Sequence, residues 1–206
     1  MPIESWDGLP MAIIPFSTLN LQEEFVKNKL VPEGTGRNEG AEFVVEKRFE
    51  DQLYFLVSGS IYRSLFGAES SDQYWSGRFD GRYTAAAAAG KEWDLRRNAF
   101  GLHFKALSFG GQRERLIDQV ASAEQGYTIF DPMSDYSVTL PNYFRIDLRA
   151  SWRKNMPGRT RTLSIDIQNL SNRENGAGYY FDTFKQQVQL RKQLGIIPVL
   201  TWRLEF

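Results

Sequence analysis

The sequence predicts an all-β fold: an antiparallel up-and-down sheet of about seven to eight strands, forming a segment of a transmembrane β-barrel. Three observations support this prediction. Apolar and polar residues alternate over long stretches, short turns alternate with long connections, and many polar strand positions are charged. Strict alternation indicates strands with one apolar and one polar face. Alternating segments of about ten residues are typical of strands that cross a bilayer.

The clearest strand is residues 142–155, NYFRIDLRASWRKN. One face is apolar and the other is mostly charged. The apolar face carries Phe144, Ile146, Leu148, Ala150 and Trp152, and the polar face carries Arg145, Asp147, Arg149, Ser151 and Arg153. About 9–11 residues suffice for a tilted strand to cross a membrane. This segment is therefore long enough to do so.

Other segments show the same alternation. They are 41–47, 53–64, 78–90, 99–107, 162–168 and 198–206. The alanine run at 85–89 has helical propensity. It lies inside an alternating segment and has no N-cap, so we predict a strand there. We expect 160–181 to be one long strand, and residues 1–34 to be an irregular start with a partial strand at 16–22.

The connections differ in length. Tight turns are expected at 49–52, 94–98 and 155–158, and longer connections at 66–73 and 110–140. Short turns on one side and long loops on the other are typical of outer-membrane barrels. Residues 110–140 are therefore expected to be an extracellular loop. Its charged cluster lies where a loop helix could form, so a solvated face is the plain alternative: Arg113, Glu114, Arg115 and Asp118.

Composition excludes several classes of function. The 206 residues include 25 basic and 25 acidic side chains, which gives no global electrostatic case for nucleic acid. Cysteine is absent, which rules out disulfides, thiolate zinc sites and a cysteine nucleophile. No stretch approaches the roughly 20 apolar residues of a membrane-spanning helix. The apolar cluster at 11–16 is too short for a signal-peptide core, so we expect no export signal in this chain.

Alternation alone also fits a soluble antiparallel sheet with one wet face. Long strands, charged polar faces and aromatics at strand ends favour the barrel. Such aromatics form girdles at the membrane interfaces, although β-propensity also explains any one of them. They are Tyr143, Trp152, Tyr179, Tyr180 and Trp202.

The candidate sites are weak. His103 is the only histidine and is expected to face the lumen beside Lys105, which is too little for a metal site. The glycine-rich segments 34–40 and 109–113 are interpreted as loops, because no helix follows to bind phosphate. No Ser-His-Asp set is evident. The sequence therefore predicts no enzyme, cofactor or metal.

Two charged rows are expected to form cross-strand ion pairs on the polar faces. Their main effect would be to wet a lumen and to fix strand register. The rows are Arg78, Asp80 and Arg82, and Arg145, Asp147 and Arg149 with Asp166.

The C-terminal half carries a specific resemblance. LPNYFRIDLRASWR, a short turn, and RTLSIDIQNLSNREN resemble the penultimate strands of TonB-dependent outer-membrane receptors, which end in an Asn-Leu-x-Asn lip. Here the lip is residues 169–172. GIIPVLTWRLEF resembles the closing strand of that family, and GRNEGAEFVVEKRF with YFLVSGSIYRS resembles a hairpin of the same receptors. The similarity runs from about residue 16 to 206 and is nearest to Bacteroidetes-like forms.

The resemblance implies a piece of a 22-stranded, plugged barrel. The expected fold of residues 1–206 is an open, strongly curved sheet, with the plug domain, TonB-contacting box and signal peptide outside this chain. The implied function is the C-terminal wall of a receptor for nutrient uptake, of unknown substrate class, not transport-competent alone. The implied location is the outer membrane of a Gram-negative cell. The implied partners are outer-membrane lipid, the rest of the barrel with its plug, and the barrel-assembly machinery.

The resemblance also implies an assembly signal in the last strand. Its residues share one face and end on an aromatic: Leu200, Trp202, Leu204 and Phe206. Two other readings stay open. A complete small outer-membrane barrel would have a structural or adhesive role, and a soluble β-domain would act as an enzyme or binding module.

Overall fold

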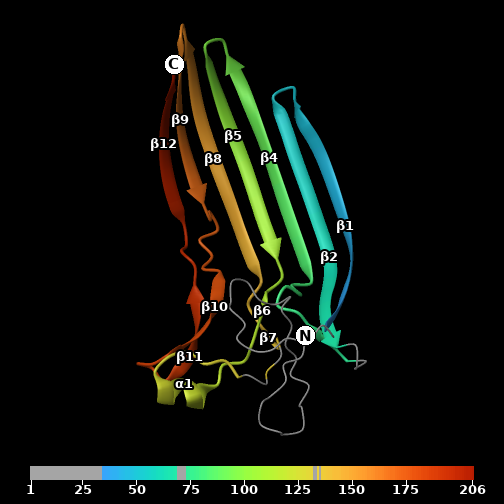
Figure 1. Ribbon diagram of the computed structural model, residues 1–206. Coiled ribbons are helices and arrows are strands. Elements are labelled where there is room, and N and C mark those ends of the chain that lie inside the picture. Colours follow the sequence, from blue (N-terminus) through green and yellow to red (C-terminus); the bar gives the residue numbers. More distant parts are fainter. Residues whose placement is uncertain (1–33, 69–72, 132–133, 135) are drawn as a thin grey trace.

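The computed structural model describes residues 34–68, 73–131, 134 and 136–206 (Figure 1). The expected partial strand at 16–22 lies outside these residues. The described chain is almost entirely strand, with one short helix. Its elements are β1 (Gly34–Glu50), β2 (Leu53–Ala68), β3 (Tyr74–Ser76), β4 (Tyr83–Leu95), β5 (Asn98–Phe109), β6 (Arg113–Glu114), α1 (Gln119–Gln125), β7 (Val138–Thr139), β8 (Tyr143–Met156), β9 (Arg159–Gln168), β10 (Gly176–Asp182), β11 (Gln187–Lys192) and β12 (Ile197–Glu205).

One large antiparallel sheet dominates the structure. Its strands follow the order β1-β2-β4-β5-β8-β9-β12, and β3 pairs with the end of β2. Two small sheets, β10-β11 and β6-β7, lie apart from it. The all-β, antiparallel prediction is confirmed. The predicted count of seven to eight strands is too low, because the described residues form twelve strands, of which eight belong to the main sheet.

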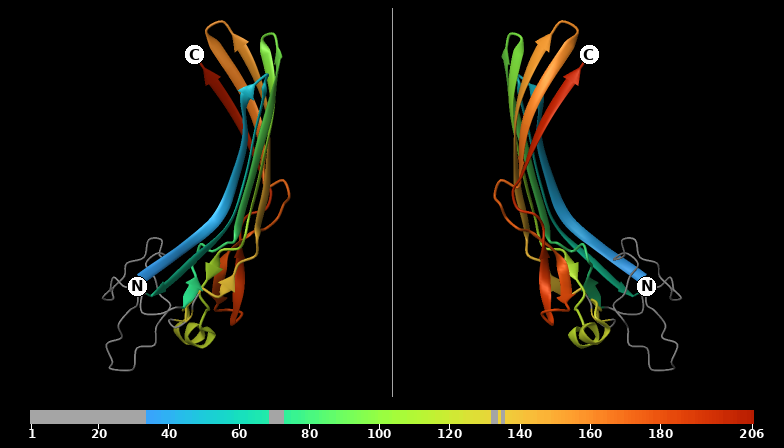
Figure 2. Two further views of the ribbon diagram at one scale, coloured as in Figure 1. Left: turned by 90° about the vertical axis from the view of Figure 1, so that its right-hand side faces the viewer. Right: turned by 90° about the vertical axis from the view of Figure 1, so that its left-hand side faces the viewer.

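The main sheet is long and bowed (Figure 2). The three tight turns and the C-terminus lie at one end, and α1, β6, β7, β10 and β11 gather at the other (Figure 1). We call these the turn end and the loop end. The strands of the sheet reach 17 residues in β1 and 14 in β8. A typical soluble strand has about 5–6 residues.

The tight turns form where the sequence predicts them. Asp51 and Gln52 join β1 to β2 with φ angles of 51° and 64°. Two consecutive positive φ values characterise the type I′ turn, whose twist matches that of the flanking strands. At the β8–β9 turn the positive φ of 71° falls on Gly158, which adopts it without steric cost.

Three predicted boundaries are wrong. The strand expected at 78–90 begins only at Tyr83, because Arg82 has a φ of 73° that interrupts an extended backbone. The strand expected at 160–181 breaks after Gln168, where Asn169 turns with a φ of 54°. The glycine-rich segment 34–40, interpreted as a loop, belongs to β1. By contrast, the alanine run is part of β4 as predicted.

The buried hydrophobic residues gather at the loop end. Four of the six in the described residues come from the segment 110–140 and from β10: Ile117, Tyr136, Leu140 and Phe181. Many large apolar side chains of the main sheet stay exposed, such as Ile165 at 50% and Leu200 at 71%. The sheet therefore has no apolar layer covering it within the described residues.

The Asp51–Gln52 turn provides a test of the fold. Replacing the pair with Asn-Gly should raise the free energy of unfolding by about 0.5–1 kcal/mol, because these residues favour positive φ. Urea unfolding of the folded chain measures this change. As a control, Gln187→Gly at the start of β11 should lower stability, since its backbone is extended. Equal effects at both positions would contradict the turn assignment.

Candidate functional site

The register of the main sheet sorts its side chains onto two faces. Rows of directly paired residues run across the strands, and neighbouring rows point to opposite sides. One row is Tyr54, Gly90, His103, Arg149, Asp166 and Val199, and we call its side the polar face. A hollow of about 650 Å³ lies on this face, over β4, β5, β8, β9 and β12.

Small residues shape the floor of the hollow. Tyr54 on β2 reaches across β4 to His103 on β5, with its hydroxyl 3.2 Å from Nδ1. The strand between them carries Gly90, where a Cβ atom would collide with both rings. A side chain at this position would therefore separate Tyr54 from His103. Sequence reasoning placed His103 on this face but missed the glycine that lets it meet a tyrosine.

A second contact also skips a strand. Arg153 on β8 spans β5 and reaches Glu92 on β4 at 3.2 Å. The β5 residue opposite Arg153 is Ala99, which is 4% exposed, and the residue opposite Glu92 is Gly101. Small residues on the middle strand thus accompany both contacts. The alternating pattern contained this signal at positions 90, 99 and 101.

The predicted charged rows are brought together in part. Arg149 pairs across strands with Asp166 at 3.6 Å and donates to the Ser164 hydroxyl at 3.1 Å. Arg145 instead pairs along its own strand with Asp147 at 2.6 Å. These side chains are partly exposed, and such pairs typically contribute 0–1 kcal/mol each. The polar face is therefore a wetted, charge-paired surface.

The first predicted row, Arg78 to Arg82, does not lie on a strand. The Asp80 side chain is fully buried beside β2, where its carboxylate accepts the Ser64 N–H at 3.0 Å. Arg82 and Arg113 lie 3.1 and 3.7 Å from the other carboxylate oxygen. Asp80 thus joins β2 to the loop-end segment that contains Arg113.

The loop-end charged residues serve the packing of 110–140. Glu114 accepts the Tyr179 N–H at 2.9 Å, and the Arg115 guanidinium lies 5.0 Å from the centre of the Phe130 ring. Asp118 caps α1 by accepting the Ala121 N–H at 2.9 Å. The helix therefore begins after this cluster, at Gln119, and Arg113 and Glu114 lie in β6. All four side chains therefore make contacts within the loop end.

The opposite side of the sheet, the apolar face, carries an aligned aromatic row at the turn end. Trp93, Phe100, Trp152, Leu163 and Trp202 are directly paired across β4, β5, β8, β9 and β12. Lys91 lies among the apolar residues beside this row, with Nζ 5.6 Å from the centre of the Trp93 ring. Of the other predicted girdle residues, Tyr143 stacks on Phe109, and Tyr179 and Tyr180 belong to the separate β10-β11 sheet.

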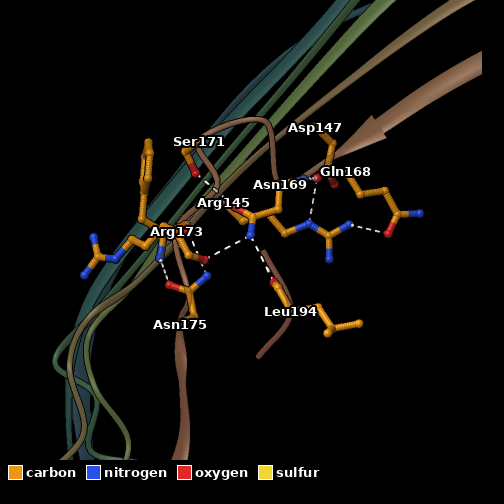
Figure 3. A network of polar contacts seen from close by, with 9 residues as sticks. Arg145, Asp147, Gln168, Asn169, Ser171, Arg173, Asn175 and Leu194 are labelled. Atoms are coloured by element: carbon orange, nitrogen blue, oxygen red, sulfur yellow. Dashed lines mark hydrogen bonds and ion pairs between the residues drawn. The ribbon is translucent and has the colours of Figure 1, made fainter. Parts of the chain in front are cut away.

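The Asn-Leu-Ser-Asn lip lies in a connected network of polar contacts (Figure 3). Asn169 is 4% exposed, and its N–H donates to Asp147 Oδ1 at 2.9 Å. Its side-chain amide donates to the backbone carbonyls of Arg173 and Leu194, at 2.9 and 3.2 Å. One side chain thus ties together the end of β9, the lip and the segment before β12.

Asn175 replaces a missing strand beside β8. Its side chain accepts the Phe144 N–H at 3.0 Å and donates to the Phe144 carbonyl at 2.9 Å (Figure 3). This pair of hydrogen bonds reproduces the exchange between two residues of an antiparallel ladder. Asn175 is 3% exposed, so water does not substitute for it. The sequence pattern marked residues 169–172 but gave no sign of this role for Asn175.

The predicted assembly-signal residues lie at the free edge of the sheet. Leu200 and Trp202 are 71% and 64% exposed on β12, and Phe206 follows the strand at 94%. Leu204 shares their face and is half-buried. Their role as a signal stays a prediction.

The described residues contain no cluster of His, Cys, Asp or Glu that could hold a metal ion. In the same part of the chain, no helix is long and apolar enough to cross a membrane. Comparisons with protein families, with curated proteins and with solved structures give no match.

Asn175 can be tested by replacement. Asn175→Leu leaves the N–H and carbonyl of Phe144 without partners, which should lower the free energy of unfolding by about 2–4 kcal/mol. Urea unfolding measures the loss, and amide exchange should accelerate at Phe144. Asn155→Leu, at an exposed asparagine near the β8–β9 turn, should cost less than about 0.5 kcal/mol. Equal losses in the two variants would show that the Asn175 amide has no special role.

Proposed function

We propose that this chain is a wall segment of a TonB-dependent outer-membrane receptor barrel. The observation that carries the proposal is the apolar face with its aligned aromatic row. Seven strands about 4.8 Å apart are roughly 29 Å wide, and the eight steps from Phe144 to Trp152 cover about 26 Å. The apolar face of the sheet therefore has an area of roughly 750 Å². Soluble monomers rarely expose apolar patches above about 300–600 Å², so lipid is the fitting environment.

The dimensions suit a bilayer. Strands tilted by about 40° would turn those 26 Å into roughly 20 Å of height, most of the roughly 25 Å apolar band of outer-membrane barrels. The aromatic row then lies at one interface, where Trp is favoured. Long cationic chains inside the band reach toward the same end, as snorkelling requires. Lys91 lies against Trp93, and Lys47 reaches Glu50 at 3.8 Å.

The polar face supports a wide lumen over a narrow one. It carries Arg145, Arg149 and Arg153 in one column, with carboxylates around them. An eight-stranded barrel has an interior that side chains fill, and burial there would make each unpaired charge costly. The alternative is a complete small barrel with a structural or adhesive role. The charged hollow favours the large barrel.

In this proposal the chain forms part of the barrel wall and does not itself gate transport. The turn end faces the periplasm and the loop end faces outward, following the short-turn and long-loop pattern of such barrels. Uptake of a nutrient would need the plug and the rest of the barrel. The substrate class is not part of the proposal.

Depth-dependent fluorescence quenching tests the proposal. Variants that keep a single tryptophan, with the others changed to Phe, are reconstituted into vesicles containing brominated lipids. Trp202, 64% exposed on the apolar face, should be quenched strongly. Trp75 is the matched control, because it packs against Phe66 at the loop end of β2, with ring centres 6.0 Å apart, and should be quenched little. A Trp202 emission that lipid bromine leaves unchanged would exclude the membrane role.

The proposed assembly signal has its own test. Phe206→Ser should lower the yield of membrane-inserted protein several-fold when assembly machinery is present, and change spontaneous folding into pure lipid vesicles little. Thr201→Ser, on the opposite face of β12, is the control and should leave both yields unchanged. If Phe206→Ser reduces the two yields equally, the residue stabilises the sheet and carries no signal.

A further inference from the structure

Asn175 is followed directly by Gly176, and no other asparagine of the 206-residue chain precedes a glycine. Asparagine is a thermolabile residue, and a following glycine makes it more so. Because glycine has no Cβ atom, its backbone bends easily, and its nitrogen can approach the side-chain carbonyl carbon of the asparagine. The chain thus places a chemically labile pair at the residue that completes the hydrogen bonding of β8.

The folded structure holds this pair away from reaction. Both polar ends of the Asn175 side chain bind Phe144 on β8, at 3.0 and 2.9 Å. The Asn175 carbonyl accepts the Gln193 N–H at 2.8 Å, and Gly176 pairs with Lys192 in the β10-β11 sheet. Asn175 is 3% exposed, which keeps water and base away from it. Attack of the Gly176 nitrogen on the Asn175 side chain therefore requires these contacts to open first.

Packing explains why a glycine stands at position 176. A Cβ atom there would lie 3.1 Å from Leu190 Cδ1 and 3.3 Å from Pro141 Cδ. Both distances are shorter than ordinary van der Waals contacts, so a larger residue would displace its neighbours. The residue that makes the pair labile is therefore the one that the fold accommodates best.

We propose that Asn175 is a deamidation site that the fold protects, so that the unfolded chain loses this side chain irreversibly and the folded chain keeps it. In the reaction the Gly176 nitrogen forms a bond to Asn175 Cγ and gives up its proton, and the side-chain nitrogen leaves as ammonia. Water then opens the succinimide ring at either carbonyl, which yields aspartate or isoaspartate. No oxidant or reductant is needed.

Neither product can replace the asparagine. A carboxylate accepts hydrogen bonds but donates none. The Phe144 carbonyl would lose its donor and would face a buried negative charge, which is costly. Isoaspartate also adds an atom to the backbone, which would shift Gly176 relative to Lys192. Deamidation would therefore act as a one-way limit on the time that the chain can stay unfolded. This role goes beyond the proposed membrane function, because it needs only the contacts of Asn175.

Mass spectrometry after timed incubation tests the protection. The chain is kept folded, or unfolded in urea, in the same mildly alkaline buffer, and deamidation is measured in the peptide that contains Asn175. We expect deamidation of the folded chain to be at least about tenfold slower, because it must await local opening. Met156→Gly is the matched control, since it creates a second Asn-Gly pair at the exposed Asn155. In that folded variant, Asn155 should deamidate faster than Asn175.

Refolding tests the consequence. Chain that has been aged in urea until partly deamidated is refolded, and the folded fraction should contain several-fold less deamidated residue 175 than the fraction that fails to fold. Asn175→Asp should refold with a several-fold lower yield, whereas Asn155→Asp should refold like the unmodified chain. Equal deamidation of Asn175 in the folded and unfolded chains would overturn the proposal. Equal shares of deamidated chain in the two refolding fractions would overturn it as well.

Discussion

The antiparallel register of the main sheet is the constraint on which the other features depend. Because side chains alternate with a period of two, shifting one strand by one residue would move its whole apolar set to the other face. The observed register aligns Trp93, Phe100, Trp152 and Trp202 in one row. The same register stacks the charges on the polar face. The apolar face and the charged polar face are thus two consequences of one pairing pattern.

Register in turn depends on how each strand ends. At the turn end, two-residue turns with positive φ determine which residues face each other. At the loop end β9 stops at Gln168, yet β8 continues, and its backbone needs partners. Asn175 supplies them at Phe144 with its side-chain amide, and Leu170 donates its N–H to the Ile146 carbonyl at 2.7 Å. The Asn169 N–H donates to the Asp147 side chain on the same strand. The lip therefore lets the chain leave the sheet without exposing an unpaired edge of β8.

The sequence predicted the features that follow from a local period and missed those that depend on contacts distant in the chain. The alternation in 142–155 identified β8 and both of its faces, and the turns at 49–52 and 155–158 were located correctly. The break of 160–181 was missed, because the aromatic residues of β10 also favour a strand and nothing local shows that it pairs with β11. Asp80 was assigned to a strand for the same reason. Its burial follows from Ser64 and Arg113, which lie 16 and 33 residues away along the chain.

Small residues on the polar face connect the register to the proposed function. A polar-face glycine on an interior strand lets side chains of the two neighbouring strands contact each other above it. Gly90 does this for Tyr54 and His103. Such contacts stiffen three strands at once, because the central strand cannot slide without moving a side chain laid across it. Two other small residues, Ala99 and Gly101 on β5, line the hollow on the polar face. In the proposed barrel this face would form a polar, charge-paired lumen surface, and the apolar face would be left for lipid.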